Sequence, residues 1–107
     1  MDTQLTARQL HKLADLMEQG QMSETGARAL GKVLSYEADV ARGQLAQLKS
    51  DLAAYESKYK ISSRDFFARF QAGETDDRME YVEWASLYQM ALNLEKRIEL
   101  LGGVVSA

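Results

Sequence analysis

Five carboxylates within residues 74–83 are the side chains whose type and spacing best suit chemistry: Glu74, Asp76, Asp77, Glu80 and Glu83. Such a group suggests a divalent-cation site or an acid–base pair. A calcium loop, however, sets its oxygen ligands at alternate positions around an obligatory glycine and ends in a glutamate. The stretch ETDDRMEYVE has neither that glycine nor that spacing. We therefore expect these carboxylates to mark the start of a helix, where the helix dipole favours negative charge.

The other residue types that support catalysis are scarce. His11 is the single histidine, and no nucleophile lies near it in the sequence, so we expect a partly exposed residue on the flank of a helix. The absence of cysteine excludes disulfides, thiolate catalysis and cysteine-ligated zinc. No glycine-rich phosphate loop or nucleophile motif is present. The sequence thus predicts a protein that is not an enzyme and has no catalytic residue, metal or cofactor.

Length and composition indicate one helical domain over residues 1–107. Proline, which breaks helices, is absent. The net charge of −3 gives no general attraction to nucleic acid or anionic lipid. The N-terminus lacks the basic start and apolar run of a signal peptide, and no apolar run approaches the ~20 residues of a membrane span. We expect a cytoplasmic protein without a membrane segment.

Capping signals divide the chain into four predicted helices, over about 6–19, 24–60, 63–72 and 77–101. Thr6 and Gln9 form a capping box, and Ser23 and Ser62 are typical caps for the second and third helices. Asp77 and Glu80 have capping-box spacing at the start of the last helix. Two glycines after Leu101 predict a helix stop and a tail over residues 102–107.

Apolar or small residues recur at heptad spacing in both long helices, which is typical of helices that pack along each other. In the predicted helix over 24–60 they are Ala27, Gly31, Leu34, Ala38, Ala41, Leu45, Leu48, Leu52, Tyr55 and Tyr59, and in the last helix they are Trp84, Leu87, Ala91, Leu94, Ile98 and Leu101. The predicted fold is all-α: these two helices form an antiparallel, coiled-coil-like hairpin closed by a short Phe-rich connecting helix. The short N-terminal helix lies beyond the other end. A helix of this length spans about 55 Å, so part of it needs a partner, and we expect a homodimer.

Two alternative functions are compatible with the pattern. Residues 6–34 have the outline of a helix-turn-helix, with candidate DNA-binding residues Arg8, Lys12, Arg28 and Lys32. Over residues 1–34 these four cations are balanced by Asp2, Asp15, Glu18 and Glu24, so the basic surplus of a stand-alone DNA binder is missing. A small dimeric DNA-binding regulator therefore stays an alternative, as does a structural coiled-coil adaptor.

Residues 52–101 resemble the C-terminal pattern of small helical bacterial and archaeal proteins encoded beside a toxin gene, the antitoxin components of toxin–antitoxin operons. The resemblance is carried by Tyr55, Glu56, Tyr59, Ser62, Ser63, Phe66, Phe70, Gly73, Glu74, Asp77, Glu83, Trp84, Leu87, Tyr88 and Leu94. It implies a non-catalytic protein-binding module that binds and neutralises a toxin encoded by a neighbouring gene. Residues 1–33 are outside the resemblance.

The expected partner surface combines the exposed half of the long helix with the acidic start of the last one. Its candidate residues are Tyr36, Val40, Glu80, Glu83 and Tyr88. An acidic surface suits a basic, nuclease-like partner, because complementary charge speeds association and selects the partner.

Overall fold

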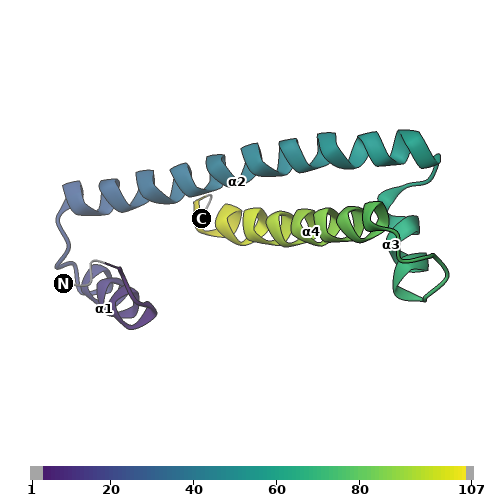
Figure 1. Cartoon of the computed structure of the whole chain (residues 1–107). Coiled ribbons are helices and arrows are strands. Elements are labelled where there is room, and N and C mark those ends of the chain that lie inside the picture. Colours follow the sequence, from purple (N-terminus) through teal and green to yellow (C-terminus); the bar gives the residue numbers. More distant parts are fainter. Residues whose placement is uncertain (1–3, 106–107) are drawn as a thin grey trace.

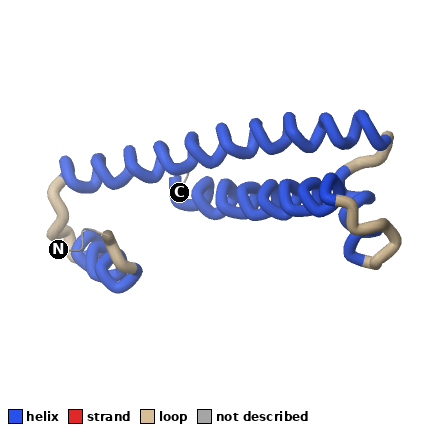
Figure 2. The backbone as a smooth tube through the Cα atoms, viewed as in Figure 1, coloured by secondary structure: helices blue, strands red, loops and turns tan. Residues whose placement is uncertain are grey.

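The computed structural model describes residues 4–105, and every regular element among them is a helix. Helix α1 spans Ala7–Glu18, α2 spans Glu24–Tyr59, α3 spans Ser63–Gln71 and α4 spans Met79–Val105 (Figure 2). The all-α prediction is confirmed. None of the helices in this part of the chain is both long and apolar enough to cross a membrane.

Helices α2 and α4 run antiparallel, and α3 lies at the end where the chain reverses (Figure 1). The predicted helical hairpin is therefore confirmed. Its core takes large side chains from both helices, including Leu48 and Leu52 from α2 and Trp84 and Leu94 from α4. These residues occupy the heptad positions, so the repeat that predicted the hairpin is also the repeat that fills it.

Two backbone features turn the chain at the closed end of the hairpin. Lys60 ends α2 in the left-handed conformation (φ 57°), and its N–H donates to the carbonyl of Glu56. Gly73 follows α3 at φ 73°, a conformation that costs glycine little. Between them Ser62 caps α3 by accepting the N–H of Asp65 at 3.1 Å, as its sequence predicts.

The other end of the molecule is open. No residue from 4 to 37 is buried, although α1 forms with the predicted capping box between Thr6 and Gln9. In Figure 1, α1 lies near the N-terminal end of α2 and beyond the C-terminal end of α4. The molecule measures 58 × 26 × 23 Å with a radius of gyration of 19.5 Å, whereas a compact domain of this length has about 13 Å.

The boundaries of the last helix differ from the prediction. Helix α4 begins at Met79, and Glu80 does not take part in a capping box with Asp77 because both its carboxylate oxygens accept hydrogen bonds from α2. The predicted stop after Leu101 is wrong: the helix continues through Gly102 and Gly103 to Val105. A glycine costs a helix only about 1 kcal/mol, so two glycines do not by themselves end a helix of this length. Residues 1–3 and 106–107 of the predicted domain lie outside the described residues.

The glycines give a first test of the fold. Gly43 is exposed in α2, and a Cβ added there meets no atom within 4 Å. We expect Gly43→Ala to raise the free energy of unfolding by about 1 kcal/mol, because alanine loses less backbone entropy in a helix. Urea denaturation followed by circular dichroism measures it. Gly73→Ala is the matched control and should lower the free energy of unfolding, because a φ of 73° strains any L side chain. If both substitutions change the free energy of unfolding in the same direction, these backbone assignments are contradicted.

Candidate functional site

The aromatic side chains at the closed end pack on one another, and four of them also line a surface hollow: Tyr59, Phe66, Tyr81 and Trp84. Trp84 is fully buried. Its ring stacks on that of Phe66 with centroids 3.8 Å apart and planes 3° from parallel, and Tyr55 and Tyr59 stack on it at 5.4 and 5.5 Å. We call these residues together with Tyr81 the aromatic corner. Offset and edge contacts of this kind add to the area that the rings bury, so the aromatic corner is core.

A short hydrogen-bond chain satisfies the polar groups inside this core. The indole Nε1–H of Trp84 donates to Oγ of Ser63 at 2.8 Å, and the backbone N–H of Ser63 donates to Oε2 of Glu56 at 2.7 Å. The chain links α4 to α3 and α3 to α2. Among the described residues no buried side-chain nitrogen or oxygen lacks a partner, so the interior of the corner is fully hydrogen-bonded.

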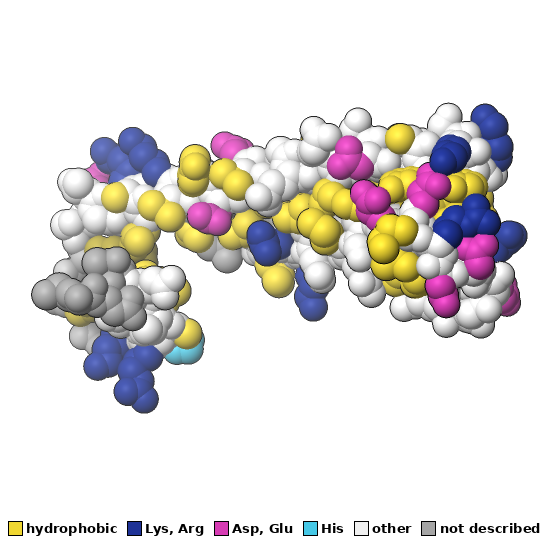
Figure 3. Space-filling view, in the orientation of Figure 1, with side chains coloured by type: hydrophobic (Ala, Val, Ile, Leu, Met, Phe, Trp, Pro, Cys, Tyr) yellow, Lys and Arg dark blue, Asp and Glu magenta, His cyan; other side chains and the backbone are white. Residues whose placement is uncertain are grey.

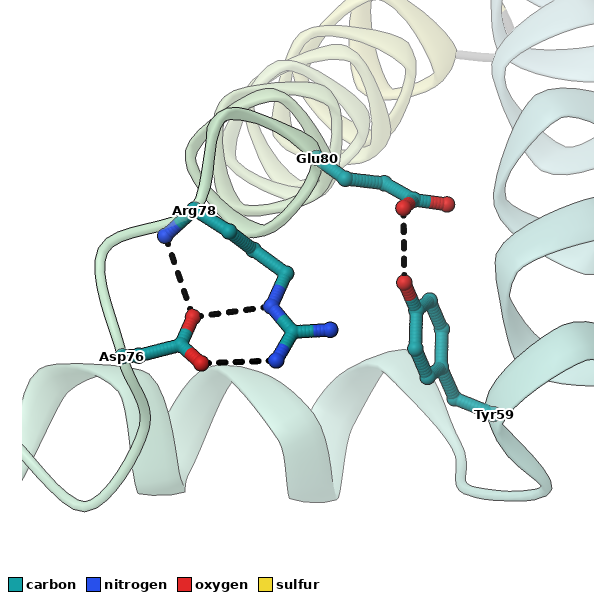
Figure 4. Close-up of polar contacts among 4 residues, drawn as sticks. All are labelled: Tyr59, Asp76, Arg78 and Glu80. Carbon is teal, nitrogen blue, oxygen red and sulfur yellow. Dashed lines mark hydrogen bonds and ion pairs between the residues drawn. The ribbon is translucent and has the colours of Figure 1, made fainter.

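Of the carboxylates before α4, Asp76 is held by hydrogen bonds within the chain. Asp76 forms a two-pronged pair with Arg78, whose Nε and Nη2 donate at 2.9 and 2.7 Å (Figure 4). The hydrogen bonds from the Arg78 side chain hold the pKa of Asp76 at about 2. The same guanidinium lies 4.5 Å from the centroid of the Tyr81 ring. Asp76 and Arg78 thus shape the loop into α4 and stay charged at neutral pH.

Glu80 ties the start of α4 to the end of α2. It accepts from Nζ of Lys58 at 2.6 Å and from the hydroxyl of Tyr59 at 2.7 Å; the bond to Tyr59 is drawn in Figure 4. The hydrogen bond from Lys58, followed by that from Tyr59, lowers the pKa of Glu80. No group of three or more potential metal ligands occurs in residues 4–105. His11 is exposed on α1.

The predicted partner-binding residues fall into two separate places. Tyr36 and Val40 are 66% and 39% exposed on α2. Glu80 is hydrogen-bonded to α2, and Glu83 is exposed. Tyr88 is half-buried, with its ring centroid 5.1 Å from that of Phe67. Tyr36 lies about 35 Å along α2 from Tyr59 at the 1.5 Å rise of an α-helix. The structure therefore does not bring the five residues into one patch.

The candidate DNA-binding residues are not gathered on one face either. At the open end of the molecule, Figure 3 shows the Lys and Arg side chains of α1 on one side and those of the first turns of α2 on the opposite side. Arg28 also pairs with Glu24 at 3.0 Å. A continuous basic stripe that could follow a phosphate backbone is absent from this view.

Two apolar faces are exposed at the open end, and of their residues only Tyr36 and Val40 were candidates from the sequence. On α1, Leu10 and Met17 are 48% and 50% exposed, and Leu13 between them is half-buried; we call these three residues the α1 face. On α2, exposed residues form what we call the outer stripe: Ala29, Val33, Tyr36 and Val40. The signal for both was present in the 3–4 spacing, but spacing does not reveal which apolar face stays uncovered.

The Ser63–Trp84 bond gives a second test. Ser63→Ala leaves the indole N–H of Trp84 buried without an acceptor, and we expect the free energy of unfolding to fall by about 1–3 kcal/mol. In a Trp84→Phe background the same substitution leaves no buried N–H without an acceptor, so it should lower the free energy of unfolding clearly less. Urea denaturation of the four proteins completes the double-mutant cycle. Equal costs of Ser63→Ala in both backgrounds would refute the bond.

The hydrogen bonds that Glu80 accepts from Lys58 and Tyr59 predict that the stability of the fold depends on pH. Because the pKa of Glu80 is lower in the folded protein, its contribution to stability is present above the unfolded value of about 4.3 and is lost as the pH falls through the folded pKa. Glu80→Gln should therefore flatten the fall of unfolding free energy on acidification below pH about 4.3. Glu99→Gln, which changes an exposed carboxylate on the same helix, should leave the profile close to that of the parent. If the unfolding free energies of the two variants depend on pH in the same way, the stabilising role of the Glu80 hydrogen bonds is contradicted.

Comparison with known proteins adds no family to these observations. No family model matches the chain, and neither a curated protein nor a solved structure matches it.

Proposed function

We propose that this chain is a non-catalytic protein-binding module of the antitoxin kind, which binds and neutralises a toxin encoded by a neighbouring gene. The observation that carries the proposal is the α1 face. Its two outer members are about half exposed, although α1 is a complete, capped helix. The resemblance of residues 52–101 to antitoxins supplies the kind of partner.

An exposed apolar face on a short helix favours a binding role for a thermodynamic reason. Isolated helices shorter than about 12–15 residues are marginal in water, and most helices in proteins are stabilised by packing of an amphipathic face. Helix α1 has 12 residues and no buried side chain. A partner that covers Leu10, Leu13 and Met17 would provide the missing packing.

The spacing of the α1 face fits a recurrent recognition mode. An amphipathic helix that docks in an apolar groove is anchored at positions i, i+3, i+4 and i+7, and Leu10, Leu13 and Met17 occupy i, i+3 and i+7. Arg8 and Lys12 lie on the opposite side of the helix at 100° per residue, so they would stay in solvent in the complex. The partner's groove is thus expected to be mainly apolar.

Charge supports the choice of a basic toxin. The net charge of −3 would speed encounter with a cationic partner and disfavour acidic ones. Of the carboxylates near the start of α4, Glu74, Asp77 and Glu83 are exposed and supply this field, while Asp76 and Glu80 are occupied within the chain. We place the complex in the cytoplasm, where the products of one operon meet.

Co-expression with each neighbouring reading frame tests the proposal. One of these products should be toxic alone, lose its toxicity with this chain and copurify with it. The double variant Leu10→Glu with Met17→Glu should lose copurification and protection, because two carboxylates would have to enter an apolar groove.

The matched control is His11→Glu, which adds a carboxylate at an exposed position of the same helix outside the α1 face. It should retain both copurification and protection. Circular dichroism and urea denaturation verify that the hairpin is intact in each variant, as expected because α1 contributes no buried residue. Failure of every neighbouring product to copurify or to be neutralised would refute the proposal.

A further inference from the structure

We propose that a second copy of this chain docks antiparallel on the outer stripe of α2. This self-association goes beyond the proposed function, because it uses a face of α2 and leaves the α1 face free. The outer stripe includes Tyr36, whose 66% exposure is high for an aromatic side chain, and Val33, which is 55% exposed.

The outer stripe is a face distinct from the one that packs on α4. At 100° per residue its four members fall within an arc of about 60°, centred about 140° around α2 from the buried Ala38 and Ala41. The same face becomes polar further along the helix, at Gln44, Gln47 and Asp51. The apolar part therefore ends with Val40 and covers about 16 Å of helix. In Figure 3 hydrophobic side chains are visible on the side of α2 that faces away from α4.

The spacing of the outer stripe is self-complementary. Its steps of four, three and four residues read the same in both directions. When two copies of α2 run antiparallel about a two-fold axis between Leu34 and Ser35, Ala29 of each copy lies opposite Val40 of the other, and Val33 lies opposite Tyr36. An antiparallel two-fold contact between helices pairs one end of a patch with its other end, and this spacing lets apolar residues meet along its whole length.

Opposite charges along one edge of the outer stripe support the antiparallel arrangement and a second copy as the occupant. Lys32 and Asp39 lie along the same edge of the outer stripe, in a shallow depression that also includes Tyr36. In the antiparallel pair Lys32 comes within about 3 Å, measured along the axis, of the level of Asp39 of the partner subunit, and symmetry repeats the pair. In a parallel two-fold pair the partner's Lys32 and Asp39 would lie on the opposite edge of the interface, so Lys32 and Asp39 of different copies would not meet. The exposed Asp39–Arg42 pair, at 3.1 Å, is weak enough to rearrange.

The surface of the single chain is large enough for such a contact. Its accessible area is 8205 Å², whereas a compact monomer of 12.0 kDa exposes about 6000 Å². The excess is roughly 2000 Å², and a standard interface takes about 800 Å² from each partner. Because the outer stripe is short, we expect a dimer with a dissociation constant in the micromolar range.

Sedimentation of the purified full chain over the micromolar range tests the proposal. The parent should pass from monomer to dimer. Tyr36→Glu should remain monomeric, and Met79→Glu, at a 77% exposed position near the closed end, should dimerise like the parent. A parent that stays monomeric throughout, or a dimer that Tyr36→Glu leaves unchanged, overturns the proposal.

A charge exchange tests the pairing itself. Lys32→Asp and Asp39→Lys should each weaken dimerisation about tenfold, because each replaces two attractive contacts by two repulsive ones. The double variant restores opposite charges and should recover most of the affinity, a result that a general loss of folding cannot produce. No recovery in the double variant overturns the pairing.

The direction of the helices can be measured directly because the chain has no cysteine of its own. A spin label on Gln44→Cys should report about 29 Å along the axis between the two copies in the antiparallel dimer. Parallel helices would bring the labels to about the 10 Å that separates packed helices, and would overturn the proposal.

The same variants separate this inference from the proposed function. Tyr36→Glu should still copurify with the toxin and neutralise it, whereas Leu10→Glu with Met17→Glu should still dimerise. If Tyr36→Glu instead abolishes toxin binding and the parent is monomeric, the outer stripe is the site of the other protein and the second copy is ruled out.

Discussion

The stacking of Trp84 between α2 and α3 is the interaction on which the rest of the structure depends. Its ring lies 3.8 Å from Phe66 and 5.4 Å from Tyr55, and its indole N–H is bound by Ser63. Three helices therefore meet at one side chain. With the start of α4 held against the end of α2, the register of the whole hairpin follows, because two antiparallel helices cannot slide once one end is fixed.

That register explains why the molecule is open at its other end. Helix α2 has 36 residues and α4 has 27, so an antiparallel pairing that starts at the aromatic corner uses up α4 before it reaches the start of α2. The buried residues of α2 accordingly begin at Ala38. Before that point the heptad residues Ala27, Gly31 and Leu34 have no neighbour from α4 that buries them, and α1 is too short to enclose them.

The two ends therefore differ in chemistry. At the closed end the polar groups are committed to one another: Glu80 to Lys58 and Tyr59, and Asp76 to Arg78. At the open end apolar side chains face solvent on both α1 and α2. Binding free energy is gained where apolar surface leaves water, and both proposed contacts use apolar faces of the open end. A two-fold contact through the outer stripe would leave two copies of the α1 face available, one in each subunit.

The sequence by itself determined the helices and their pairing. Heptad spacing set the antiparallel hairpin, and Thr6, Ser23 and Ser62 set three helix starts, because a cap is a local contact with the backbone a few residues away. The tertiary structure decided the features that depend on contacts between residues distant in the sequence. Glu80 has the spacing of a capping residue, but Lys58 and Tyr59 on another helix offer its carboxylate stronger donors. Gly102 and Gly103 have the composition of a stop, but α4 continues to Val105, because the propensity cost of a glycine is only about 1 kcal/mol. Which apolar faces remain exposed was likewise decided by the register at Trp84, since exposure depends on where the partner helix ends and not on the spacing of the residues themselves.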